Sequence, residues 1–113
     1  MTSDLVMEIQ ELIRKLDISI RMIRKTGTDF AIAEREHAVL LSQESLKLRD
    51  DGMAVTMIDK VVNGLKPVAD AKFEKTVAEA VYKANLEAVN AIKLNIKIKD
   101  SQLGREWVNP PSS

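Results

Sequence analysis

Apolar residues near the start of the chain recur at intervals of four and three, the spacing that places them on one face of a helix. Ser3 or Asp4 supplies a helix N-cap, Arg24 and Lys25 fall in the last turn, and Gly27 supplies a left-handed stop. The apolar face consists of Leu5, Ile9, Leu12, Leu16, Ile20 and Ile23. The pattern predicts a first helix that ends at Gly27.

A second helix is predicted to start at Thr28 or Asp29, where the carboxylate lies near the positive end of the helix dipole. It runs to about Arg49 and stops at the Asp-Asp-Gly sequence that ends in Gly52. A link as short as the one at Gly27 usually folds two amphipathic helices back on each other. We therefore expect the first two helices to form an antiparallel hairpin.

Between Gly52 and Gly64 the sequence MAVTMIDKVVN indicates one more short helix. Thr56, followed three residues later by Asp59, resembles a capping box. We interpret this segment as a structural elbow. The alternative is the opening of a helix-turn-helix DNA reader, but no basic recognition helix of ordinary length follows.

The longest helix is predicted to run from Pro67 to about Leu103, roughly 55 Å at ~1.5 Å per residue. The segment 93–99 alternates with the period of a strand, but no turn residue precedes it, so helix is favoured and strand remains the alternative. Gly104 is expected to fray the helix end and Trp107 to fold back on the bundle. Residues 109–113 are expected to be a disordered tail.

This third helix carries two adjacent apolar stripes. One consists of Val77, Val81, Ala84, Ala88, Ala91 and Ile98, and the other of Ala78, Tyr82, Val89, Ile92, Ile96 and Leu103. Together they are too wide for one partner helix, and the alanines permit close approach of a neighbour. We therefore expect a homodimer or higher oligomer with an interface along Val81, Ala84, Ala88, Val89, Ile92 and Ile96.

The predicted fold is all-α: a helical hairpin plus a long third helix in a coiled-coil-like, oligomeric bundle with a short helical elbow. One domain over residues 1–108 fits a chain of this length. An aromatic fraction of 4% indicates an aliphatic core, and a formal net charge of zero gives no overall field that would recruit nucleic acid. The lack of cysteine excludes disulfides and thiolate chemistry and favours an intracellular location. Neither a signal peptide nor a membrane span is apparent.

Two acidic motifs have spacings that occur in metal sites. Glu34 and His37 have the i, i+3 spacing of four-helix iron sites, but a solvated helix face explains them more simply. Glu8 and Glu11 resemble half of the magnesium site of all-α nucleotide pyrophosphohydrolases, whose second acidic pair is missing here. We therefore expect no metal, no cofactor and no enzymatic activity.

Two groups of basic residues could contact phosphates. They are Arg14, Arg21 and Lys25 on the first helix and Lys93, Lys97 and Arg105 near the end of the third. Acidic residues are interspersed and aromatic stacking platforms are lacking, so ordinary solvated faces are favoured over a nucleic-acid footprint.

Two blocks of the sequence, residues 34–64 and 73–107, resemble a group of uncharacterised small helical proteins encoded by tailed bacteriophages and prophages of Gram-positive bacteria. The resemblance covers about residues 34–107. Its motif is Gly-x-x-Val-Thr-x-Ile, starting at Gly52, followed by Val-Ala-Glu-Ala-x-Tyr-Lys from Val77. The group has proline where Ala54 stands and an aromatic residue where His37 stands, which further weakens a metal role for His37. The resemblance implies a phage context in a bacterial cytoplasm and implies no activity.

From these features we expect a non-catalytic phage accessory protein that binds a host or phage protein, with inhibition of a host defence system as the most concrete form. A nucleic-acid-binding accessory of phage replication or recombination is the first alternative. An oligomer that binds a small molecule, such as a nucleotide, or a metal is the second. No membrane partner is expected.

Overall fold

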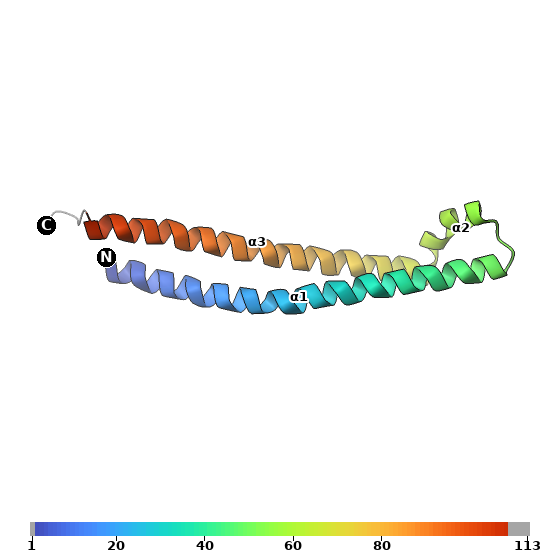
Figure 1. Cartoon of the computed structure of the whole chain (residues 1–113), viewed down its shortest axis with the longest axis horizontal. Helices are drawn as coiled ribbons and strands as arrows, with labels where there is room; N and C mark the ends of the chain where they lie inside the picture. Colours follow the sequence, from blue (N-terminus) through green and yellow to red (C-terminus); the bar gives the residue numbers. More distant parts are fainter. Residues whose placement is uncertain (1, 109–113) are drawn as a thin grey trace. The chain divides into compact units, whose positions relative to one another are not determined.

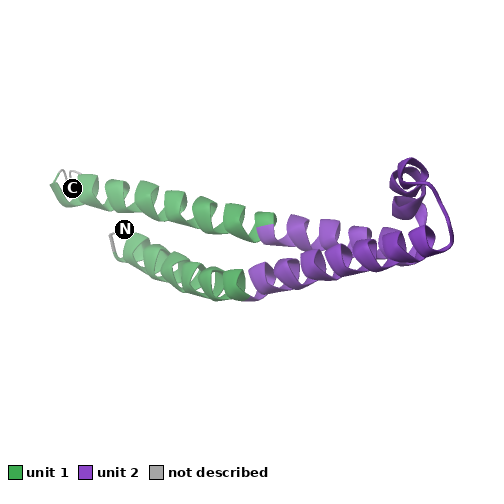
Figure 2. Ribbon diagram, turned by 45° about the vertical axis from the view of Figure 1, so that its right-hand side comes forward, with its two compact units in different colours: residues 1–24, 83–113 green, residues 25–82 purple. Residues whose placement is uncertain are grey.

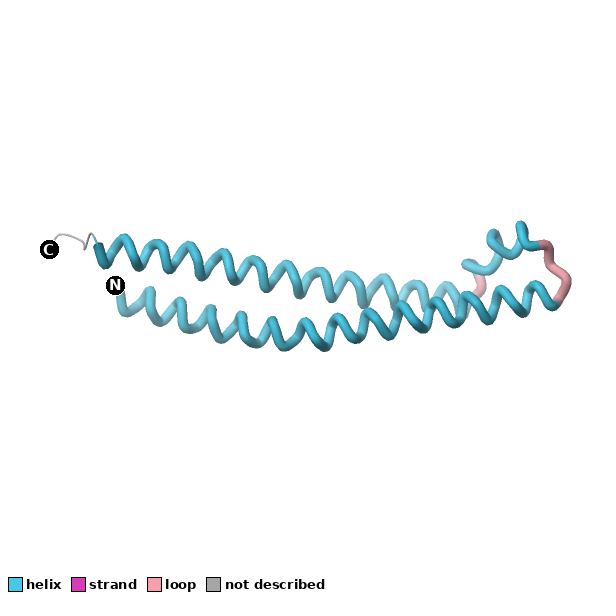
Figure 3. Tube along the Cα trace, viewed as in Figure 1, coloured by secondary structure: helices cyan, strands magenta, loops and turns pink. Residues whose placement is uncertain are grey.

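The computed structural model describes residues 2–108, and over that range the chain forms helices and no strand (Figure 1). Helix α1 spans Thr2–Asp50, α2 spans Val55–Val61, a 3-10 turn η1 spans Val62–Gly64, and α3 spans Lys66–Val108. Short loops flank the α2–η1 segment (Figure 3). The all-α fold, the helical elbow and the long last helix are confirmed. The predicted tail at 109–113 lies outside the described residues.

The chain divides into two compact units (Figure 2). Unit 1 consists of residues 1–24 and 83–113, and unit 2 of residues 25–82. Each unit therefore contains one part of α1 and one part of α3. The prediction of a single domain stays a prediction.

In unit 1 most of the buried and half-buried side chains follow the four-and-three spacing of a coiled-coil seam. On α1 the seam consists of Leu5, Ile9, Leu12, Leu16, Ser19 and Ile23, and on α3 of Asn85, Val89, Ile92, Ile96, Lys99, Leu103 and Glu106. Glu11 and Leu86 are half-buried outside this spacing. The Asn85 amide Nδ2 donates to the Ser19 carbonyl oxygen over 3.1 Å, and Lys99 Nζ lies 2.9 Å from the Glu8 carboxylate. Residue numbers rise on one helix as they fall on the other, so the two segments are antiparallel.

In unit 2 the best-packed region lies where α2 and η1 meet the start of α3. Ile58, Val62 and Val68 are buried there, and Val68 is 0% exposed. The half-buried side chains of Leu41, Leu48, Met53 and Leu65 pack around them. The elbow is therefore a structural part of the core, as the sequence predicts.

Helix α1 ends in a Schellman motif, because the amide of Gly52 donates to the Arg49 carbonyl and the amide of Met53 donates to the Leu48 carbonyl, both over 3.0 Å. Gly52 has a φ of 90°, in the left-handed region that favours glycine. Met53 and Leu48 belong to the same apolar cluster, which completes the motif. The predicted helix end at this glycine is confirmed.

We expect Gly52→Ala to lower the free energy of unfolding by about 1 kcal/mol, since alanine is strained at positive φ. No atom lies within 4 Å of the position that the new Cβ would take, so backbone strain is the only cost. Urea unfolding followed by circular dichroism measures the change. An alanine variant as stable as the natural chain would contradict this description of the cap.

The predicted hairpin turn at Gly27 is wrong, because α1 continues through that residue to Asp50. The spacing of buried positions runs without a break from Ile23 through Thr26 to Phe30. Gly27 does not have a positive φ, and Lys25 Nζ contacts the Asp29 carboxylate across it over 2.8 Å. A glycine inside a helix costs only about 1 kcal/mol, which the continuous seam outweighs. The reversal of the chain falls instead between α1 and α3.

Three local predictions also need correction. Helix α2 begins at Val55 after Ala54, with no side-chain cap, so the capping box at Thr56 is absent. Ile20 is 47% exposed, and Ser19 takes its place in the seam. Trp107 is 80% exposed and stays within α3, so it does not fold back.

Two of the remaining predictions for α3 are confirmed, and the predicted fraying of its end at Gly104 is wrong. Pro67 stands in its first turn, and residues 93–99 are helical, so the strand alternative is excluded. Gly104 does not end the helix, which continues to Val108.

Candidate interaction surfaces

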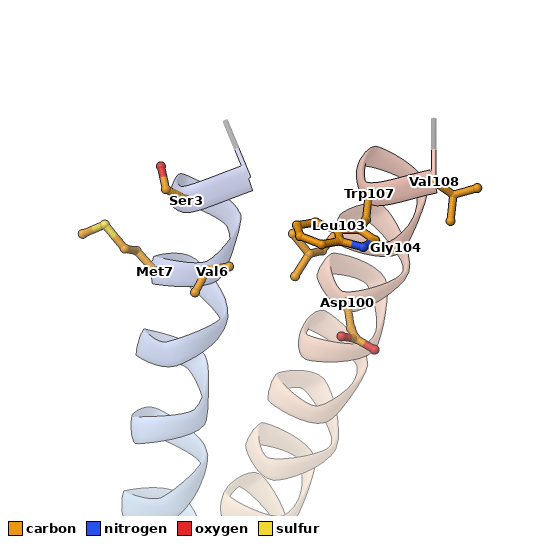
Figure 4. Close-up of a pocket in the computed structure, with 8 residues that line it drawn as sticks. All are labelled: Ser3, Val6, Met7, Asp100, Leu103, Gly104, Trp107 and Val108. Carbon is orange, nitrogen blue, oxygen red and sulfur yellow. The ribbon is translucent and has the colours of Figure 1, made fainter. Parts of the chain in front are cut away.

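A hollow in unit 1 lies between the first turns of α1 and the last turns of α3 (Figure 4). Its volume is about 740 Å³. Val6 on α1 faces Leu103 and Trp107 on α3 across it. The lining residues are Ser3, Val6, Met7, Asp100, Leu103, Gly104, Trp107 and Val108.

The chemistry of this terminal hollow is mostly apolar. Val6, Met7 and Val108 are 39%, 66% and 75% exposed. The charged group in the lining is the carboxylate of Asp100. Gly104 leaves the wall open, with no atom within 4 Å of the position a Cβ would take. Such a hollow suits an apolar group with a cation at its edge.

Sequence reasoning missed the terminal hollow because it placed the chain reversal at Gly27. A turn at Gly27 would pair the first helix with the second, so it would not bring the start of the described chain next to its end. The sequence did contain a signal for this hollow, because apolar residues occur near both ends of the chain. They are Val6 and Met7 near the start and Trp107 and Val108 near the end. Antiparallel pairing of α1 with α3 brings these two groups together within unit 1.

The structure divides the predicted oligomer interface between two faces of α3. In unit 1, Val89 is 5% exposed and Ile92 and Ile96 are half-buried, all in the seam that faces α1. Ala84 and Ala88 are exposed on a different side of the helix, as is Val81 in unit 2. The first group therefore packs within the chain, and the second remains accessible.

Three of the basic residues proposed to contact phosphates already pair with acids one helical turn away. Arg14 hydrogen-bonds Glu11, Arg21 hydrogen-bonds Asp17, and Lys25 pairs with Asp29. The guanidinium of Arg14 holds the pKa of the Glu11 carboxyl below its ordinary value. These pairs leave less positive charge on α1 for a nucleic acid.

The other three basic residues, Lys93, Lys97 and Arg105, are exposed on α3 and form no ion pair with another described residue. Contact of either basic group with nucleic acid stays a prediction.

The two acidic motifs are placed as follows. Glu8 pairs with Lys99, and Glu11 pairs with Arg14. Glu34 is exposed, whereas His37 is half-buried, and its buried Nε2 has no hydrogen-bond partner among the described residues. Among residues 2–108, no three histidine, cysteine, aspartate or glutamate side chains are grouped as a metal site requires.

Comparison with protein-family models, with curated proteins and with solved structures finds no match to this chain. Within the described part of the chain, no helix combines the length and the apolar character needed to cross a membrane.

Proposed function

We propose that this protein is a non-catalytic interaction module that binds another protein through the terminal hollow of unit 1. The observation that carries the proposal is the indole of Trp107, which is 80% exposed beside a mostly apolar hollow of about 740 Å³. Tryptophan is among the residues most enriched in binding hot spots, and an apolar pocket with few polar groups is the usual form of a binding site.

The composition of the hollow indicates the chemistry of its partner. Leu103, Val6 and Trp107 offer apolar surface on both sides, so an apolar helix face or a short apolar segment fits between them. Asp100 would pair with a lysine or arginine at the edge of that segment. Groove binding of an amphipathic helix is a common mode of recognition between proteins.

The resemblance to small phage and prophage proteins supports a phage accessory that acts in the host cell on a host or phage protein. Inhibition of a host defence system is the most concrete form of that role. Binding alone is sufficient for it, because a helical module that occupies a partner's surface can block the partner without any chemistry of its own.

We expect Trp107→Ala to weaken partner binding about thirtyfold, the loss typical of a hot-spot residue worth about 2 kcal/mol. The full chain serves as bait for proteins from phage-infected bacteria, and the affinity of each captured protein is then measured by titration. Trp107 is the only tryptophan of the chain, so a blue shift of its emission on binding reports burial of the indole.

Phe73→Ala is the matched control, since Phe73 is a 66% exposed aromatic residue on the same helix but not in the hollow. Capture that is lost with Trp107→Ala and kept with Phe73→Ala supports the proposal. A partner that binds the natural chain and both variants equally, and leaves the Trp107 emission of the natural chain unchanged, would place binding elsewhere.

A further inference from the structure

A row of exposed apolar residues on α1 extends from the terminal hollow along unit 1. Val6, which lines the hollow, is followed at intervals of seven residues by Ile13 and Ile20. Residues seven apart lie on the same side of a helix that packs along a coiled-coil seam. These three side chains are 39%, 51% and 47% exposed. The row is about 21 Å long at ~1.5 Å per residue, or about four helical turns.

Helix α3 supplies the other edge of this surface. Asp100 and Gly104 line the terminal hollow together with Val6, so they lie on the same side of the helix pair (Figure 4). Lys93 precedes Asp100 by seven residues, and Lys97 precedes Gly104 by the same interval. Both lysines therefore lie on the side of unit 1 that carries the apolar row.

The apolar row and the two lysines also lie at the same level along unit 1. One ion pair and one hydrogen bond join the two helices across the seam and fix their register. Ile13 lies near the midpoint between the α1 residues of these two contacts, and Lys93 lies near the midpoint between their α3 residues. The lysines are therefore beside the middle of the row. We call the surface formed by these residues the basic flank: Val6, Ile13, Ile20, Lys93 and Lys97.

The positive charge of the basic flank is not neutralised within the described chain. Lys93 and Lys97 are exposed and form no ion pair with another described residue. The other charged residues on this side of unit 1 are Asp17, which pairs with Arg21, Asp100 in the lining of the hollow, and Arg24 and Lys83, which each make an interaction of their own. Two cations beside an apolar row are thus available to a partner.

We propose that the basic flank binds one amphipathic helix of the partner protein. The apolar edge of that helix packs on the row that starts at Val6, and its carboxylates pair with Lys93 and Lys97. This proposal rests on the function proposed above, since the flank continues from the terminal hollow and its charges specify the helix that enters it. Helices pack readily into the groove beside a helix pair, and opposite charges along the edges fix their register.

The pattern of charges favours a helix over an evenly anionic surface. The carboxylates of Asp17 and Asp100 lie on the same side of unit 1 as the two lysines. A lipid headgroup layer or a nucleic-acid backbone would bring negative charge against all of these groups and would be repelled by the two acids. A helix can place carboxylates beside the lysines alone.

Two designed peptides of about 21 residues, or three heptads, serve as probes. Both carry leucine at the two seam positions of each heptad. They differ at the flanking positions, which are glutamate in the acidic peptide and lysine in the basic peptide, so like charges keep each peptide from pairing with itself. Fluorescence anisotropy of the labelled peptides, titrated with the full chain, gives the dissociation constants. We expect the acidic peptide to bind at least about tenfold more tightly, and its binding to weaken as salt is raised.

Reversal of the two lysines tests where the acidic peptide binds. Lys93→Glu combined with Lys97→Glu should weaken its binding at least about tenfold and should favour the basic peptide. The matched control combines Lys15→Glu with Arg105→Glu, which changes the net charge equally at exposed residues outside the flank and the terminal hollow. This control should change either dissociation constant less than about threefold.

Equal effects of the two double variants, or no binding of either peptide, would overturn the proposal. A DNA duplex and phosphatidylserine vesicles are titrated alongside, and tighter binding of either through Lys93 and Lys97 would assign the flank to that ligand instead. Self-association that the lysine reversal abolishes would assign the flank to a second copy of the chain. Partner capture that depends on Trp107 but not on the two lysines would overturn this proposal and leave the proposed function intact.

Discussion

Val68→Asp is expected to lower the free energy of unfolding by at least about 3 kcal/mol. Val68 is 0% exposed and packs with Ile58 and Val62, where α2 and η1 meet the start of α3 in unit 2. A carboxylate there would lose its hydration with no partner to replace it. Urea unfolding followed by circular dichroism measures the loss.

Val55→Asp is the control for this prediction. Val55 is 63% exposed at the first position of α2, where a negative charge near the helix N-terminus is tolerated or favourable. The two variants differ in burial but not in chemistry. If Val68→Asp were as stable as Val55→Asp, the core of unit 2 could not be where the structure places it.

Gly27→Pro is expected to cost about 3 kcal/mol or more, because proline inside a helix removes one backbone hydrogen bond and clashes with the preceding turn. Gly27 lies near the middle of α1, so the loss affects an uninterrupted helix. Loss of helical circular dichroism on heating reports the change in stability.

Gly27→Ala separates a helical glycine from a turn glycine. Alanine favours the helix by about 1 kcal/mol, whereas its Cβ would lie 3.1 Å from Cε1 of Tyr82 and would displace that ring slightly. The two effects oppose each other, so the net change should be less than about 1 kcal/mol. A tolerated proline together with a costly alanine would instead indicate a turn at Gly27.

The two glycines show what the sequence can and cannot predict. Gly27 and Gly52 each follow a helical pattern with basic residues in its last turn, and the pattern predicts a helix end at both. Only Gly52 has a positive φ. The difference is tertiary, because the seam continues past Gly27 and the Tyr82 ring occupies the space that a side chain there would take. Local patterns do not contain that information.

The sequence predicts which residues share a helix face better than it predicts which helix packs against that face. The spacing of apolar residues predicts both stripes of α3. Each stripe is regular enough to pack against another helix, so the spacing alone does not show which stripe faces inward. The pairing of α1 with α3 was required to show that Val89, Ile92 and Ile96 face inward in unit 1 while Ala84 and Ala88 remain exposed. The terminal hollow depends on the same pairing, so it could not be derived from either end of the chain alone.

We propose that another protein chain covers apolar helix surface that this chain leaves exposed. Sedimentation equilibrium of the unmodified full chain at micromolar concentration tests it most directly. We expect a mass at least twice that of the 12.6 kDa chain. A mass of one chain across the whole concentration range, with the helices intact by circular dichroism, would contradict it.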